Sequence, residues 1–229
     1  MMIIADNHTL TDVLLAWRYG NAVYYFSLAV LFLIGIAAVF IRHDIFRAKW
    51  AFVALAVAVL PAAAEWLTGI RLPWPMKVLI TLALILHTAG GAFGLYFSLY
   101  PIYDKIAHLV ASIAIAWLIF VVILVTGGLF RMYPGRFWTC CGIFLAVMLL
   151  GLSWEYEELF IDLSTGTTYF VNPADSFFDM VFNIIGASYV VLIVNAYLKS
   201  ESFEQLYLRF IRWQGPQEPG IPSPQDRSG

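Results

Sequence analysis

Six apolar stretches, each about 20 residues long, constrain this 229-residue chain more than any other feature of its sequence. A transmembrane helix needs about 20 mostly apolar residues to cross a hydrocarbon core of about 30 Å. The composition agrees, because 12% of the residues are charged, where a soluble domain carries about 25%. We therefore predict an all-α fold, a polytopic membrane bundle of about six transmembrane helices. The predicted spans are Ala22–Ile41, Trp50–Gly69, Met76–Phe97, Ile106–Gly127, Phe137–Glu158 and Ser176–Leu198.

The spans form one domain, residues 1–198, because no linker between them is long enough to divide the chain. Residues 199–213 predict an amphipathic helix that lies in the plane of the membrane interface. Its apolar side chains recur at helical spacing, at Phe203, Leu206, Tyr207, Phe210 and Trp213. Residues 214–229 are rich in Pro, Gly, Ser and Gln, which predicts a disordered tail.

Charge distribution predicts the orientation and the class of partner. The short loops on the side of the N-terminus hold more Lys and Arg than the loops on the other side. We therefore expect a multi-pass protein of the inner (plasma) membrane with both termini cytoplasmic. The formal net charge is −2 and no block of basic residues occurs, which argues against a nucleic-acid partner. The expected partners are membrane lipids.

Acidic residues gather at the ends of three spans that open on one side of the membrane. They make up seven of the fifteen acids in the chain: Asp104, Glu155, Glu157, Glu158, Asp162, Asp175 and Asp179. Lys105 is the only basic residue in these stretches. Ionisable groups at such depths are energetically costly and indicate a functional site. In the predicted orientation this site is extracytoplasmic.

Asp104 and His108 are four residues apart at the start of the fourth span, so they share one helix face. A carboxylate and an imidazole at this spacing can bind a divalent cation, or the carboxylate can orient the ring as a general base. The structural alternative is that Asp104 caps the helix and His108 donates to a neighbouring carbonyl. Taken alone, the spacing leaves both interpretations open.

The fifth span ends in a run of acids. At about 100° per residue, Glu155, Glu158 and Asp162 share a face, while Glu157 points nearly opposite. Negative charge is disfavoured at a helix C-terminus, so these acids need a cation or a proton nearby. We expect Glu157 to be solvated, and Glu155, the deepest of them, to belong to the site.

The loop before the sixth span contains Asn172-Pro173-Ala174-Asp175. This pattern predicts an N-cap asparagine, a proline at the first helical position and an acid that can bond back to the cap. Asp175 therefore has a structural explanation, but Asp179, one turn further among apolar residues, has none. Gly186 predicts a point where another helix approaches closely.

Three polar residues extend the polarity inward. His87 lies near the middle of the third span, Asn183 at a similar depth in the sixth, and Glu65 near the opposite end of the second. A single histidine in an apolar span is more often a hydrogen-bonded core residue than a ligand. Glu65 has the alternative of a boundary charge that pairs with Arg71.

The region from Leu86 to Gly186 carries two spaced motifs: Asp-Lys-x2-His at 104–108 and Asp-x3-Asp-x3-Asn-x2-Gly at 175–186. With Leu86-His87, Gly90-Gly91, Glu155 and Glu158, it resembles the YjdF-like family of multispanning bacterial and archaeal membrane proteins, and more distantly the VanZ-like family. This chain has Lys105 and Ala107-His108 where YjdF-like members tend to have Arg and Gly-His. The first family has no established activity and the second is linked to glycopeptide resistance, so the resemblance implies a shared site without a reaction.

Three functions fit these residues. The first is a metal-dependent enzyme, a hydrolase or transferase, that acts on a lipid or lipid-linked substrate, with Asp104, His108, Glu155 and Asp179 as catalytic residues. Its divalent cation would draw ligands from Asp104, His108, Glu155, Glu158, Asp175 and Asp179. The second is a proton- or cation-coupled transporter, in which His87, Asn183 and Glu65 continue the acids across the bundle. The third is a structural or accessory membrane subunit. The density of acids at one depth favours the first.

Overall fold

A computed structural model describes residues 10–68, 72–166 and 172–212, and all regular structure within them is helical. Six helices are long: α1 (Leu10–Phe40), α2 (Ile45–Thr68), α3 (Trp74–Phe93), α5 (Ile102–Phe130), α6 (Arg136–Thr165) and α7 (Pro173–Ser200). Two are short: α4 (Leu95–Ser98) and α8 (Phe203–Arg212). Each long helix contains a segment apolar and long enough to cross a membrane. The predicted all-α bundle of six spans is therefore confirmed.

Two boundaries differ from the prediction near the acidic residues. Helix α3 ends at Phe93, four residues early, because Gly94 adopts a left-handed backbone with φ of 71° and caps it. Helix α5 begins at Ile102, directly after Pro101, whereas the predicted span began at Ile106. Asp104 and Lys105 consequently both lie inside the first helical turn, so Asp104 and His108 share a helix as expected.

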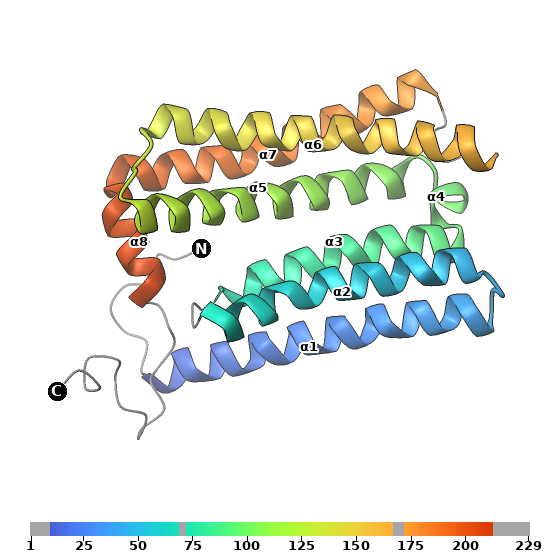
Figure 1. Ribbon diagram of the computed structural model, residues 1–229, viewed down its shortest axis with the longest axis horizontal. Helices are drawn as coiled ribbons and strands as arrows, with labels where there is room; N and C mark the ends of the chain where they lie inside the picture. The colour runs from blue at the N-terminus through green and yellow to red at the C-terminus, as the bar shows by residue number, and fades with distance from the viewer. Residues whose placement is uncertain (1–9, 69–71, 167–171, 213–229) are drawn as a thin grey trace.

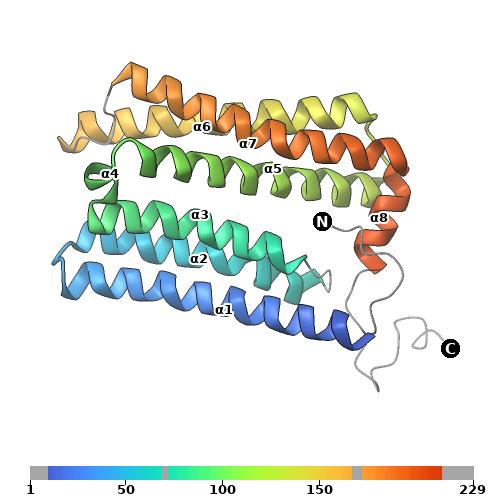
Figure 2. The same ribbon diagram turned by 180° about the vertical axis from the view of Figure 1, so that it is seen from behind.

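The long helices run roughly parallel or antiparallel in two groups, α1–α3 and α5–α7 (Figures 1 and 2). Helices α3 and α5 lie side by side in the middle and join the groups. The start of α1 and the end of α7 lie at one end of the bundle, together with α8. The turns from α1 to α2 and from α3 to α5 lie at the other end, so α5 and α7 both begin there. The acidic stretches of α5, α6 and α7 therefore share that end, as predicted.

Close packing of α5 against α7 depends on Gly186. A Cβ atom at this position would lie 3.0 Å from the Leu109 carbonyl oxygen and closer still to Ser112 Oγ. Only a residue without a side chain lets the two backbones approach this far. The prediction of a close helix contact at Gly186 is confirmed. Below it, Ala187 and Val190 are fully buried in the core that α5, α6 and α7 share.

Helix α8 crosses the end of the bundle and packs on the last turns of α5 (Figure 1). Phe203 is 7% exposed and lies against Gly127, and the Tyr207 ring lies against Gly128. The predicted amphipathic helix is therefore present, but these two aromatic side chains contact protein. Its location in the membrane interface stays a prediction. The Phe210 side chain, Trp213 and residues 214–229 lie outside the described part of the chain.

An ion pair between a buried lysine and a half-buried glutamate links α2 and α3 at the end of the bundle opposite the acids, and the lysine also bonds to α1. Lys77 Nζ donates to both carboxylate oxygens of Glu65, at 3.0 and 2.9 Å, and to Asn21 Oδ1 at 2.8 Å. The same Glu65 carboxylate accepts from the backbone N–H of Leu72 at 2.6 Å. Arg71, the partner expected from the sequence, lies outside the described residues. Glu65 is thus bound locally, far from the acidic end.

Candidate functional site

The site is assembled from two helix beginnings and one helix end. Asn172 caps α7 as predicted, because its side-chain oxygen accepts from the N–H groups of Ala174 at 2.9 Å and Asp175 at 3.1 Å. Pro173 occupies the first helical position. Since α5 begins at the same end of the bundle, the first turns of the two helices face each other. The second half of α6 supplies Glu155, Glu157, Glu158 and Asp162.

Lys105 lies at the centre of the acidic residues. Its Nζ atom is 2.6 Å from Asp175 Oδ1 and 2.6 Å from Asp179 Oδ1. A third carboxylate oxygen, Asp104 Oδ2, lies 3.1 Å away. The Lys105 side chain is 9% exposed and those of Asp175 and Asp179 are 8% and 4% exposed. One ammonium therefore offsets part of the charge of three buried or half-buried carboxylates.

No role was expected for Lys105 from the sequence. The available signal was its position as the single basic residue among the acidic stretches. The predicted fourth span began one residue after Lys105. The sequence therefore did not show that this side chain points from the first turn of α5 toward α7.

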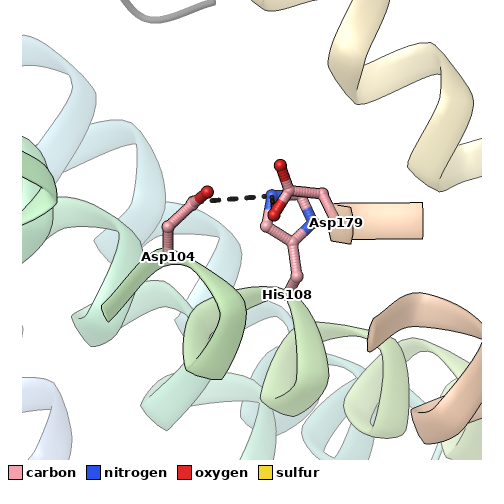
Figure 3. A group of neighbouring side chains, drawn as sticks. All are labelled: Asp104, His108 and Asp179. Atoms are coloured by element: carbon pink, nitrogen blue, oxygen red, sulfur yellow. Dashed lines mark ion pairs between the residues drawn. The ribbon is translucent and has the colours of Figure 1, made fainter. Parts of the chain in front are cut away.

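The His108 ring lies between the carboxylates of Asp104 and Asp179 (Figure 3). Its Nε2 atom lies 3.6 Å from Asp104 Oδ1 and 3.7 Å from Asp179 Oδ1. Glu155 Oε1 lies 3.8 Å from the same nitrogen. These three separations exceed hydrogen-bond length, so His108 Nε2 forms no hydrogen bond with the carboxylates around it. The four side chains named as catalytic from the sequence thus lie together, and their roles stay predictions.

Glu155 lies beside this group and is buried. The residue is 7% exposed, and its Oε1 atom has no hydrogen-bond partner among the described residues. Leaving a buried carboxylate oxygen unpaired is costly. Metal ligands at about 2.0–2.2 Å from an ion lie about 3.3–3.6 Å apart around a tetrahedron. The spacing about His108 Nε2 is close to this. The donor atoms of Asp104, His108 and Asp179 lie within 4.8 Å of one another.

Two of the six residues expected as ligands, Glu158 and Asp175, are not among the residues that surround His108 Nε2. Glu158 Oε1 accepts from Trp154 Nε1 at 2.9 Å, within α6. Asp175 Oδ1 accepts from Lys105 and, at 3.1 Å, from the Tyr100 hydroxyl. Neither acid forms an ion pair with His108 in the described part of the chain. Glu157 is exposed, as expected from its opposite helix face.

The inner polar residues have local partners. His87 Nδ1 lies 3.1 Å from the Tyr96 hydroxyl, and its ring meets the Trp154 ring edge-on at 4.7 Å between centroids. Burial raises the pKa of Tyr96 well above its usual value, so the phenol keeps its proton in this bond. Gly90 leaves room for the Tyr96 ring. Asn183 Nδ2 contacts Met180 Sδ at 3.8 Å. His87 therefore fits the hydrogen-bonded core interpretation.

Comparison with known proteins identifies the family. No curated protein and no solved structure matches the chain. A family model described as "Predicted membrane protein (DUF2238)" matches residues 23–200, a region that includes all six long helices in whole or in part and every residue of the site. Since this match covers well over half of the chain, the protein is an integral membrane protein that belongs to the DUF2238 family.

Proposed function

We propose that the protein is a metal-dependent membrane enzyme that acts on a lipid or lipid-linked substrate. Asp104, His108, Glu155 and Asp179 hold a divalent cation. The single observation that carries this proposal is the unpaired Glu155 Oε1 atom, which lies 3.8 Å from His108 Nε2, beside the group that Asp104, His108 and Asp179 form. A cation there would lower the pKa of a bound water and polarise a phosphoryl or carbonyl oxygen.

The distribution of polar groups supports an enzyme over a transporter. A coupled transporter needs polar groups that face one another at several depths, near the interface of two moving units. The proposed ligands instead come from one group of helices, α5–α7, and lie at one end. Glu65 and His87, which would continue the path, are bound to Lys77 and Tyr96.

Lys105 supports the third alternative, a structural role. Its ammonium neutralises part of the acidic charge, and such a network can hold α5 to α7 without any metal. The two interpretations differ at Glu155, whose carboxylate forms no ion pair with Lys105 in the described part of the chain. A test centred on Glu155 therefore separates a metal centre from an ion-pair network.

Glu155→Gln should abolish stoichiometric metal binding. The change keeps the shape of the side chain but removes the charge that a hard cation requires, so we expect affinity to fall about 100-fold or more. Purified protein stripped of metal is titrated with Zn²⁺, Mn²⁺ or Mg²⁺ and followed by calorimetry and elemental analysis. The metal-loaded protein is then incubated with a total membrane-lipid extract, and lipid species that it consumes are identified by mass spectrometry.

Glu157→Gln is the matched control, because it removes the same charge two residues away on an exposed face of the same helix. It should bind metal as the wild type does. Equal affinity of Glu155→Gln and the wild type, or no stoichiometric ion in either, would exclude the metal centre. Metal binding without metal-dependent lipid turnover would support a cation site but contradict the proposed enzymatic activity.

We further propose the finer assignments made from the sequence: a place beside the YjdF-like proteins, with VanZ-like proteins more distant, in the inner membrane with both termini cytoplasmic. The acids then lie on the extracytoplasmic side. Reporter fusions after Leu198 and within residues 162–173 should give opposite results, since one helix separates them. A periplasm-only reporter that is active after Leu198 would reverse the orientation.

A further inference from the structure

A groove runs between α5 and α7 on the outside of the acidic end. Its volume is about 570 Å³, within the range of about 300–1,000 Å³ that small-molecule pockets have. Its lining comes from the connection before α5 and the first turns of both helices, and includes Lys105 and Asp175. Both helices are long and apolar enough to span a membrane, so the groove lies between two membrane-spanning segments.

Polarity changes along the groove. At the end where the helices begin, its lining includes Tyr100, Lys105 and Asp175. Further in, it is lined by Ile106, Phe178 and Phe182, of which the first two are 45% and 54% exposed. Phe182 lies ten residues beyond Asn172, about 15 Å along the helix axis. The groove therefore pairs a polar end near the membrane boundary with an apolar wall parallel to lipid chains, as an amphiphile requires.

Lys105 connects this groove to the proposed metal centre. The side chain lines the groove and donates to Asp179 Oδ1, and the same oxygen lies 3.7 Å from His108 Nε2. A head group at the polar end is thus one side chain away from the group around His108. A long path through water is not needed.

The charge of the polar end selects the head group. An ammonium has three N–H donors, and Lys105 Nζ already has three carboxylate oxygens within 3.1 Å. An anionic head would find no free donor there. Behind the lining, Asp104 and Asp179 contact the same ammonium as Asp175, so three acids surround the single lysine and the surplus charge of this cluster is negative. A head group that brings its own positive charge and N–H donors complements this surface.

We propose that the groove binds a phospholipid with a primary-ammonium head. Its acyl chain lies along Ile106, Phe178 and Phe182, and its ammonium approaches the carboxylate of Asp175. This inference rests on the proposed function, because a lipid in the groove would be delivered to the metal centre. Its test requires no metal.

The test is photo-labelling in phosphatidylcholine nanodiscs with a chelator present. Two probes carry the same diazirine near the end of one acyl chain: a phosphatidylethanolamine and a phosphatidylglycerol. Adducts are mapped by peptide mass spectrometry. We expect labelling at Ile106 and Phe182 above that at Leu149 and Leu150, two exposed residues of α6. The ethanolamine probe should label the groove about two- to fivefold more than the glycerol probe, the range that a partly exposed ion pair supplies.

Asp175→Asn should remove the preference between the probes, whereas Glu157→Gln, which removes an exposed acid, should keep it. Should Asp175→Asn fail to fold, Ile106→Trp provides a second test, since it fills the groove from its exposed side and should lower labelling at Phe182. Equal labelling of the groove and α6, or a preference for the glycerol probe, overturns the proposal. Groove labelling together with unchanged metal binding in Glu155→Gln would sustain the lipid site and reject the metal centre. No preferential labelling of the groove, together with loss of metal binding in Glu155→Gln, would sustain the metal centre and reject the lipid site.

Discussion

Lys105→Met should destabilise the protein by about 3–5 kcal/mol, the cost of removing one partner from a buried ion pair. The substitution keeps the length of the side chain but leaves Asp175 and Asp179 facing each other without the ammonium that both contact at 2.6 Å. Asp104 loses its contact at 3.1 Å as well. The free energy of unfolding in detergent micelles, measured against denaturant or temperature, reports the effect.

Two further variants make this result specific. Lys199→Met removes a lysine that is exposed at the end of α7 and should change stability little. Adding Asp175→Asn to Lys105→Met should recover part of the loss, because one unpaired carboxylate is then neutral. A Lys105→Met protein as stable as the wild type would mean that the carboxylates do not depend on the ammonium.

Gly186→Val should separate α5 from α7 and cost about 3 kcal/mol, at the upper end of the usual range for an overpacked core. Even a single Cβ atom would lie 3.0 Å from the Leu109 carbonyl oxygen, and this backbone atom cannot rotate away. Gly186→Ala should show the same effect in smaller measure. Thermal unfolding of the wild type, Gly186→Ala and Gly186→Val in detergent gives their order of stability.

Gly91→Ala is the control for this series. It lies in α3, and no heavy atom would come within 4 Å of its added Cβ atom. Alanine favours a helix over glycine by up to about 1 kcal/mol, so this variant should be as stable as the wild type or more stable. Should Gly186→Ala behave like Gly91→Ala, the close approach of α5 and α7 does not limit stability.

Hydropathy and local patterns determined the architecture of this protein. Crossing a bilayer demands long apolar helices whose backbone bonds are satisfied internally, and this demand acts on each stretch by itself. The cap at Asn172 depends on residues within one turn of it. A close helix contact could be predicted at Gly186 because a residue without a side chain allows a neighbouring helix backbone to approach. Such features depend on residues that are close together in the chain, so the sequence alone was enough to predict them.

Only the tertiary structure decided which partner each acidic side chain contacts. The sequence placed six potential ligands near one another, but helix rotation and the early start of α5 direct Asp175 to Lys105 and leave Glu158 with Trp154. Glu65 likewise binds Lys77, a partner twelve residues away. Charged side chains are long and reach in several directions, so their partners depend on how whole helices pack. Only once α5, α6 and α7 are packed does the buried, unpaired oxygen of Glu155 face His108.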